Sequence, residues 1–359
     1  SHWNAKALQG GESFRRQRNL DTLAFLTMLQ REFYDRYVAA VRATGYEGEI
    51  SASNWQAGSS FSHFANLWTD AEVGTIDRHN YHGGTRKNPE TGEREIRGAS
   101  TLAKAGSGLL STGMQQVAGL PFMLSEWIHV WPNEWGVEGP AVIGAYGMGL
   151  QGWDVSYLFQ NRDDGRFSET LGREDWDVTA PQVLGVFPAV ARQVLRGDVE
   201  ESSEVVRLNV HAPSLFEGAG LDFDDEVDQG YDNKAFRSEK VSPRALAQAR
   251  VEVAFRESVT PTPEYTVATR ADDGAIVSST GQLAWVEARS GVREGGYIVI
   301  DTPGTQALVG FAEGETARLG DLSIRSASPF GAFYVTALDR DATIADADRL
   351  LVTAIGRAR

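Results

Sequence analysis

The sequence of 359 residues contains no cysteine. Disulfide bonds and thiolate chemistry are therefore excluded, although the cellular compartment stays open. Basic residues are also scarce, because 34 Lys and Arg stand against 49 Asp and Glu, for a formal net charge of −15. Nucleic acids and anionic membrane surfaces attract a basic footprint, so we expect neither as a partner. No apolar run approaches the roughly 20 residues that cross a bilayer.

Tryptophan, in contrast, is abundant. The chain has nine tryptophans. Carbohydrate sites use this residue because the apolar face of a sugar ring stacks on an indole whose N–H stays free for a hydrogen bond. The seven that fall within residues 55–176 are Trp55, Trp68, Trp127, Trp131, Trp135, Trp153 and Trp176.

The first 200 residues alternate helical and extended patterns. Residues 17–44 carry apolar side chains at helical spacing, and short strands are predicted at "ISASNW", "VGTIDRHNYHGG", "LPFMLSEW" and "LQGWDVSYLF". Helical or small-residue segments separate these strands. Such alternation predicts a parallel sheet with crossover helices, so residues 1–200 are interpreted as an α/β domain.

Residues 201–359 have a different texture. Runs such as "GGYIVIDTPGTQALVGF" and "GAFYVTALD" alternate apolar and polar residues between Gly, Asp and Pro turns. This pattern predicts an all-β domain of the sandwich type. It contains just one tryptophan, Trp285, which argues against a sugar-stacking platform there.

Polar and aromatic side chains occur at the predicted end of each strand in the first domain. In parallel α/β barrels the carboxyl ends of the strands form the active-site face, so these side chains are candidates to bind a substrate. They are Asn54, Trp55, Asp77, His79, Tyr81, Glu126, Trp153 and Asp154, with Trp131 in the loop that follows Glu126.

Glu126 is the strongest candidate for chemistry. Its segment, "PFMLSEW", predicts a buried strand that ends on a carboxylate. A nucleophilic carboxylate needs donors that keep it ionised and aimed, and the hydroxyl of Tyr81 on a neighbouring strand would supply one. The alternative is a structural carboxylate paired with an arginine.

The order of these motifs resembles the retaining glycoside hydrolases of clan A, which are built on a (β/α)8 barrel. The matching pieces are "SASNW", "DRHNYHGG", "PFMLSEW" and "GLQGWDVSYLF", which correspond to the fifth to eighth strands. The later β-domain looks like the appended domain of agarase-like or beta-galactosidase-like members. The resemblance implies the C-terminal half of a (β/α)8 barrel, strands 5 to 8, followed by a β-sandwich.

The resemblance also implies roles for residues. Glu126 matches the nucleophile on the seventh strand, His79 and Tyr81 match a pair on the sixth, and Trp153 matches a subsite tryptophan on the eighth. The acid/base of the clan is a glutamate after an asparagine on the fourth strand, and no such pair follows an apolar run before residue 50. The acid/base and the first half of the barrel are therefore expected outside this chain, on a longer or separate chain.

Two functions stay open from the sequence. One is a retaining glycosidase that hydrolyses O-glycosidic bonds of a poly- or oligosaccharide through Glu126. The other is a non-catalytic carbohydrate-binding or scaffold protein derived from such a barrel. No cofactor is expected, and the histidine spacing matches no zinc motif. A polysaccharide substrate favours a secreted or periplasmic protein, although no leader pattern opens the sequence.

Overall fold

The computed structural model describes residues 13–55, 62–131, 133–160, 176–217, 226–230, 233–238 and 240–356. The helices of the first part are α2 (Ser13–Ala43), α3 (Ser62–Val73), α4 (Glu138–Val142), α5 (Pro181–Leu184) and α6 (Phe187–Arg196). Two 3-10 helices, η1 (Thr101–Ala103) and η2 (Gly108–Gln115), and a π helix, η3 (Ile143–Leu150), complete it. Its strands are β1 (Ile76–Gly83), β2 (Thr85–Lys87), β3 (Arg94–Ile96), β4 (Phe122–Val130) and β5 (Val155–Leu158).

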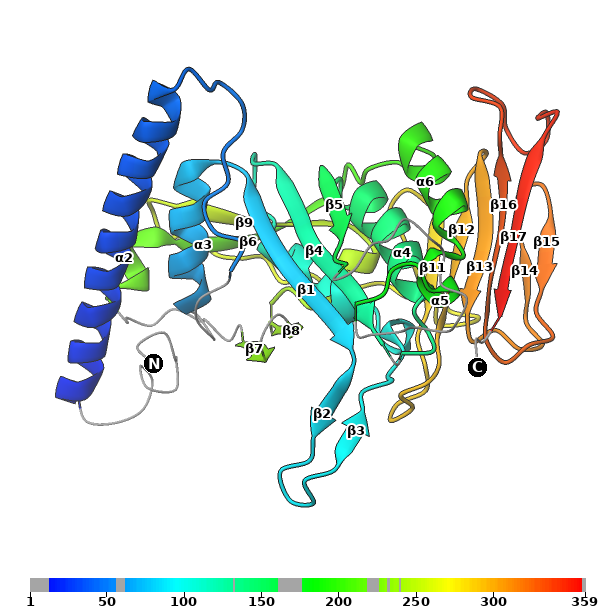
Figure 1. The fold of residues 1–359 in the computed structure, drawn as a ribbon, viewed down its shortest axis with the longest axis horizontal. Coiled ribbons are helices and arrows are strands. Elements are labelled where there is room, and N and C mark those ends of the chain that lie inside the picture. Colours follow the sequence, from blue (N-terminus) through cyan, green and yellow to red (C-terminus); the bar gives the residue numbers. More distant parts are fainter. Residues whose placement is uncertain are drawn as a thin grey trace.

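The centre of this first part is a parallel sheet of three strands in the order β1-β4-β5 (Figure 1). The helix predicted over residues 17–44 is confirmed as α2, and the strands predicted around residues 76 and 122 are confirmed as β1 and β4. The expected half-barrel is wrong, because the described residues hold a three-stranded parallel sheet and several other separate sheets, and no barrel closes.

The predicted strand "ISASNW" does not form a full strand of the parallel sheet. Only Ser51 makes a bridge, to Thr75. Two residues later the Ser53 Oγ accepts a hydrogen bond from the Trp55 amide at 3.1 Å. Such a local turn offers the backbone an alternative to a ladder, so the strand ends after one bridge.

The connection from β4 to β5 is packed unusually closely. Val190 of α6 lies so near Gly144 that an added Cβ would come within 2.4 Å of its Cγ1, and Trp153 would come within 2.7 Å of a Cβ on Gly147. Glycine at both positions lets η3 press against α6 on one side and an indole on the other. The small residues of "GPAVIGAYGMGL" therefore serve packing.

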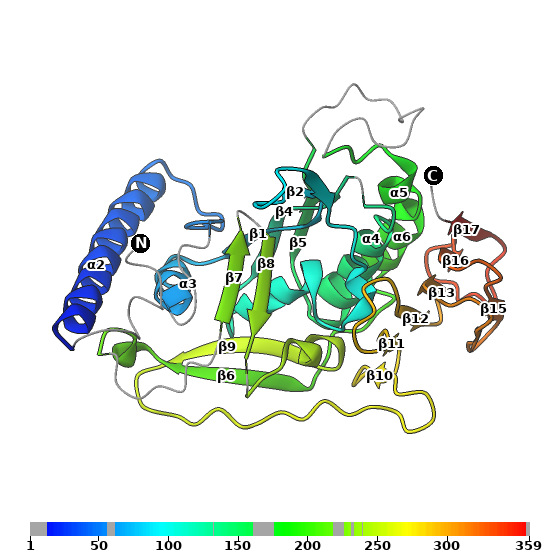
Figure 2. The same cartoon turned by 90° about the horizontal axis from the view of Figure 1, so that it is seen from below.

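The second half begins with a parallel pair, β6 (Val205–His211) and β9 (Arg250–Arg256), shown at the bottom of Figure 2. A parallel bridge from Val253 to Val117 attaches this pair to the first part of the chain. A hairpin of β7 (Glu226–Gly230) and β8 (Asn233–Arg237) and two 3-10 helices, η4 (Ala212–Leu215) and η5 (Pro243–Ala247), lie between its strands in the sequence. The division near residue 200 stays a prediction.

The remaining residues form a six-stranded antiparallel sheet in the order β10-β11-β12-β13-β16-β17. One of its faces packs toward α4 and α6, as Figure 1 shows, and β14-β15 is a separate two-stranded hairpin. The expected sandwich of two antiparallel sheets is therefore wrong, because helices take the place of a second sheet on that face. The strands are β10 (Ile276–Val277), β11 (Leu283–Val286), β12 (Tyr297–Asp301), β13 (Thr305–Gly310), β14 (Thr316–Arg318), β15 (Ser323–Arg325), β16 (Gly331–Ala337) and β17 (Leu350–Gly356).

The helix α2 lies at one edge of the molecule, beside α3 (Figures 1 and 2). It buries Leu20, Leu23 and Tyr34. Its opposite side exposes large apolar residues at helical spacing, which is more than single scattered residues would give. These are Phe25, Met28, Leu29, Phe33 and Tyr37, each at least 40% exposed.

Candidate functional site

A β-bulge shapes the sheet at the candidate carboxylate. Arg78 of β1 pairs with Leu124 of β4, but the next residue, His79, pairs with Glu126. One extra residue, Ser125, is therefore inserted in β4, and a bulge of this kind re-aims side chains. The sequence predicts that this strand ends on Glu126. That prediction is wrong, because β4 continues to Val130.

Glu126 is held by two donors from β1. The Tyr81 hydroxyl donates to the Glu126 Oε2 at 2.7 Å, and the His79 Nδ1 lies 3.2 Å from the same oxygen. The carboxylate is 32% exposed, whereas the His79 side chain is 8% exposed. Among the described residues no hydrogen bond to the other oxygen, Oε1, is formed. The two contacts therefore fix the carboxylate and leave one oxygen toward solvent.

A chain of hydrogen bonds extends from this pair to Asp77. The Ser125 hydroxyl lies 2.9 Å from the Asp77 Oδ2 and 3.1 Å from the His79 Nε2, and the Ser125 amide donates to the Asp77 Oδ1. Burial raises the pKa of Asp77, although Ser125 opposes the shift.

Protons can be arranged along this chain in two ways. With Asp77 ionised, Ser125 donates to it, and His79 must donate from both ring nitrogens. With Asp77 protonated, the Ser125 hydroxyl donates to His79, which then donates only from Nδ1 to Glu126. Both arrangements hold the same number of protons, and in both the Glu126 carboxylate accepts from His79.

Arg78 fixes β1 from the opposite face. Its side chain is fully buried and its Nη1 lies 2.9 Å from the Oδ2 of Asp70 in α3. It also donates to the Gln115 Oε1 at 2.7 Å and to the Ser53 carbonyl at 3.1 Å. Asp77 is thus not the structural partner of Arg78 through its carboxylate, and Arg78 instead joins β1 to α3, η2 and the segment before residue 55.

A row of aromatic rings begins at Tyr81, the residue that donates to Glu126. The ring of Tyr81 packs edge-on against Phe159 with centroids 5.8 Å apart, and Phe159 packs edge-on against Trp176 at 6.0 Å. Neither Phe159 nor Trp176 was singled out as a site residue from the sequence. Phe159 is the last residue of the predicted strand "LQGWDVSYLF", which shows no clear alternation, and Trp176 lies in a segment without a clear period.

Two predicted site residues lie at the wrong end of the sheet. Trp153 and Asp154 precede β5, and the Asp154 Oδ2 accepts from the Phe122 amide at the start of β4. Trp153 is 2% exposed and packs against the Phe122 ring, with centroids 5.0 Å apart. The reason is a turn at Gly152, where φ is 65°, so the strand begins after this tryptophan. Trp153 is a core residue.

The other predicted residues lie near the ends of their segments. Asn54 and Trp55 are exposed, just after the Ser53 carbonyl that Arg78 holds. Trp131 is half-buried directly after β4. Trp135, one of the seven tryptophans of residues 55–176, is buried against Phe311 and donates from its indole N–H to the Gly98 carbonyl. That Asn54, Trp55 and Trp131 contact a substrate stays a prediction.

A group of titratable residues lies near the carboxyl ends of β1 and β4. The rings of His82 and His129 are 5.0 Å apart, and burial lowers the pKa of both. Glu138 accepts hydrogen bonds from Ser100 and Thr101, yet burial raises its pKa to about 7. In the part of the chain that the structure describes, no group of His, Asp and Glu is arranged to hold a metal ion.

No family model, curated protein or solved structure matches the chain. The function is therefore argued from the geometry of the site alone. No helix within the described ranges is long and apolar enough to cross a membrane.

Proposed function

We propose that the protein is a retaining glycoside hydrolase in which Glu126 is the nucleophile. The observation that carries the proposal is the pair of donors on one oxygen. Tyr81 and His79 both contact Oε2, so Oε1 is the oxygen with which Glu126 would attack an anomeric carbon. A structural carboxylate would instead be expected to pair with an arginine, and the nearest arginine on β1, Arg78, is paired with Asp70.

The aromatic rings support a sugar as the ligand. Tyr81, which contacts the carboxylate, begins a row of rings that continues through Phe159 to Trp176, and Trp131 lies beyond the end of β4. Aromatic faces beside a half-exposed carboxylate suit a pyranose ring, which stacks its C–H face and presents its anomeric carbon. The identity of the sugar and of the linkage is left to experiment.

A retaining mechanism needs a second carboxyl group about 5–5.5 Å from the first, which protonates the leaving oxygen. We propose that this acid/base belongs to a protein segment outside the described residues. Support comes from α2, whose outer side exposes Phe25, Leu29 and Phe33 in a line. Such a stripe indicates that more protein covers this edge of the molecule.

The test uses substrates that need no acid. Dinitrophenyl glycosides expel a stable phenolate without protonation, so Glu126 alone would form the glycosyl-enzyme. We expect the chain to release dinitrophenolate from at least one of the galactosyl, glucosyl, mannosyl and xylosyl compounds. Glu126→Gln should abolish release, because the amide keeps the shape and loses the charge.

The matched control is Glu134→Gln, in the loop that follows Trp131, which should keep the wild-type rate. Loss of activity in this variant, or its persistence in Glu126→Gln, would show that the wrong carboxylate was chosen. Binding of sugar without release from any compound would favour the non-catalytic alternative.

A further inference from the structure

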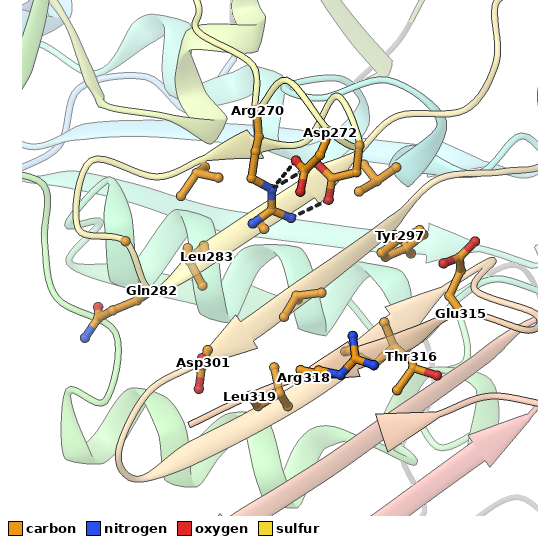
Figure 3. Close-up of a pocket in the computed structure, with 18 residues that line it drawn as sticks. Arg270, Asp272, Gln282, Leu283, Tyr297, Asp301, Glu315, Thr316, Arg318 and Leu319 are labelled. Carbon is orange, nitrogen blue, oxygen red and sulfur yellow. Dashed lines mark hydrogen bonds and ion pairs between the residues drawn. The ribbon is translucent and has the colours of Figure 1, made fainter. Parts of the chain in front are cut away.

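A cavity lies far along the chain from Glu126, on the six-stranded sheet. It measures about 460 Å³, which is within the range of about 300–1,000 Å³ typical of small-molecule sites. Figure 3 shows that its residues come from β11, β12 and β13, from the turn at residues 270–273, and from β14. We call this cavity the β-face groove.

The floor of the β-face groove is apolar with one aromatic ring. Val299 and Leu308 pair across β12 and β13, and Tyr297 lies two residues before Val299, so the three lie on one face of the sheet. Tyr297 is half-buried. A tyrosine ring in such a position can stack its exposed face on a ligand while protein contacts hold the rest of the ring.

The rim carries charges of both signs, as Figure 3 shows. On one side Arg270 donates to the Asp273 Oδ1 at 2.9 Å and lies 3.3 Å from the Asp272 Oδ1. On the other side are Glu315 and Arg318, both exposed. Within the described part of the chain, Arg318 forms no ion pair.

The rim determines the class of ligand. Four carboxylates, those of Asp272, Asp273, Asp301 and Glu315, stand against two guanidinium groups, which disfavours an anion. The two guanidinium groups offset two of these four charges and so weaken the attraction for a cation. Acceptors and donors placed together around an aromatic floor suit neutral hydroxyl groups, each of which both donates and accepts.

We infer that the β-face groove binds a neutral oligosaccharide chain, with Tyr297 stacking on a sugar ring and with Arg318 and Glu315 bonding its hydroxyls. The choice of a carbohydrate rests on the proposed function, but the binding does not require Glu126. The single tryptophan of this region takes no part, because Trp285 is fully buried and donates from its indole N–H to the Leu102 carbonyl. The sequence-based argument against a sugar platform considered only tryptophan.

The test is affinity electrophoresis of the whole chain through gels that contain agarose, galactomannan, xyloglucan or mixed-linkage glucan. We expect retardation by at least one polysaccharide, and a loss of affinity of about 5–20-fold in Tyr297→Ala. Tyr297→Trp should keep or increase retardation, because the larger ring still stacks. Arg318→Ala should weaken binding several-fold.

Two controls separate this inference from the proposed function. Tyr37→Ala removes an exposed tyrosine of α2 and should leave retardation unchanged. Glu126→Gln should also bind like the wild type while it loses hydrolysis. Absence of retardation by every polysaccharide, or retardation that persists in both Tyr297→Ala and Arg318→Ala, would overturn the inference, provided that the variants unfold at the wild-type temperature.

Discussion

The three-stranded parallel sheet and the six-stranded antiparallel sheet differ in the polar groups that they bury. Within the parallel sheet, β1 buries four consecutive polar residues, Asp77 to Asn80. In the six-stranded sheet the buried positions are apolar or neutral, and none of its described residues is a buried charge. Burying a charge costs free energy unless it is paired, so a sheet needs no such residues for stability alone. The parallel sheet is therefore the one that buries polar groups beyond what stability requires, and it is also the sheet that carries the proposed nucleophile.

The largest expected effect concerns the buried ion pair. Arg78→Met should destabilise the protein by about 3–5 kcal/mol, because the buried Asp70 would lose the arginine that neutralises it and would keep the Tyr34 hydroxyl as a donor. Arg349→Met is the matched change at the antiparallel sheet, where the pair with Asp339 is exposed, and should hardly change stability. Urea unfolding of both variants measures the difference. Equal effects would remove the contrast between the two sheets.

The next effect is a pH dependence caused by Glu138. Its pKa rises from 4.5 to about 7 in the folded protein, so the folded state binds the proton more tightly. The stabilisation is complete below pH 4.5 and is lost as the pH rises through 7. Over that window it amounts to about 3 kcal/mol.

Glu138→Gln should therefore remove this component of the pH dependence. The measurement is the free energy of unfolding at pH 5 and at pH 7.5 for both proteins. We expect the drop between these pH values to be smaller in the variant. An identical drop in both would mean that Glu138 ionises as easily when folded as when unfolded.

A smaller effect is expected at the hydroxyl that holds the carboxylate. Tyr81→Phe removes a hydrogen bond to a charged group, worth about 1.5–3 kcal/mol, so kcat on a dinitrophenyl glycoside should fall about 10–100-fold. Because His79 still contacts Oε2, some activity should remain. An unchanged kcat would show that the Tyr81 contact does not serve the reaction.

The smallest effect is expected from the same change in the other sheet. The Tyr334 hydroxyl of β16 is buried, and no hydrogen-bond partner for it lies among the described residues. Tyr334→Phe should leave activity unchanged and alter stability by less than about 1 kcal/mol, since no bond is lost. Heat denaturation and the activity assay together test this. A large loss of stability would reveal a partner for that hydroxyl.

Much of the site was predictable because strands alternate. Asp77, His79 and Tyr81 are spaced by two residues, so a strand places them on one face, and all three contact Ser125 or Glu126. The bulge at Ser125 was not predictable, because nothing in "MLSEW" marks an extra residue. It is the bulge that directs two consecutive side chains of β4 toward one face of β1.

The errors have local causes. The pattern of "LQGWDVSYLF" predicts one strand and so puts Trp153 at a strand end, whereas Gly152 turns the chain and the strand starts at Val155. The barrel was extrapolated from three strands and a fourth that makes only one bridge, at Ser51. The sandwich was inferred from alternation alone, which does not reveal whether helices or strands cover a sheet.

The central claim is that Glu126 attacks the anomeric carbon, and covalent labelling tests it most directly. A 2-fluoro glycoside with a dinitrophenyl leaving group slows the breakdown of a glycosyl-enzyme, so the sugar stays on the nucleophile. Mass spectrometry of the digested protein should find one fluoro-sugar on the peptide that contains Glu126, and none in Glu126→Gln. A label on Glu134 or on any other residue, or no label on a chain that still releases the phenolate, would contradict the account.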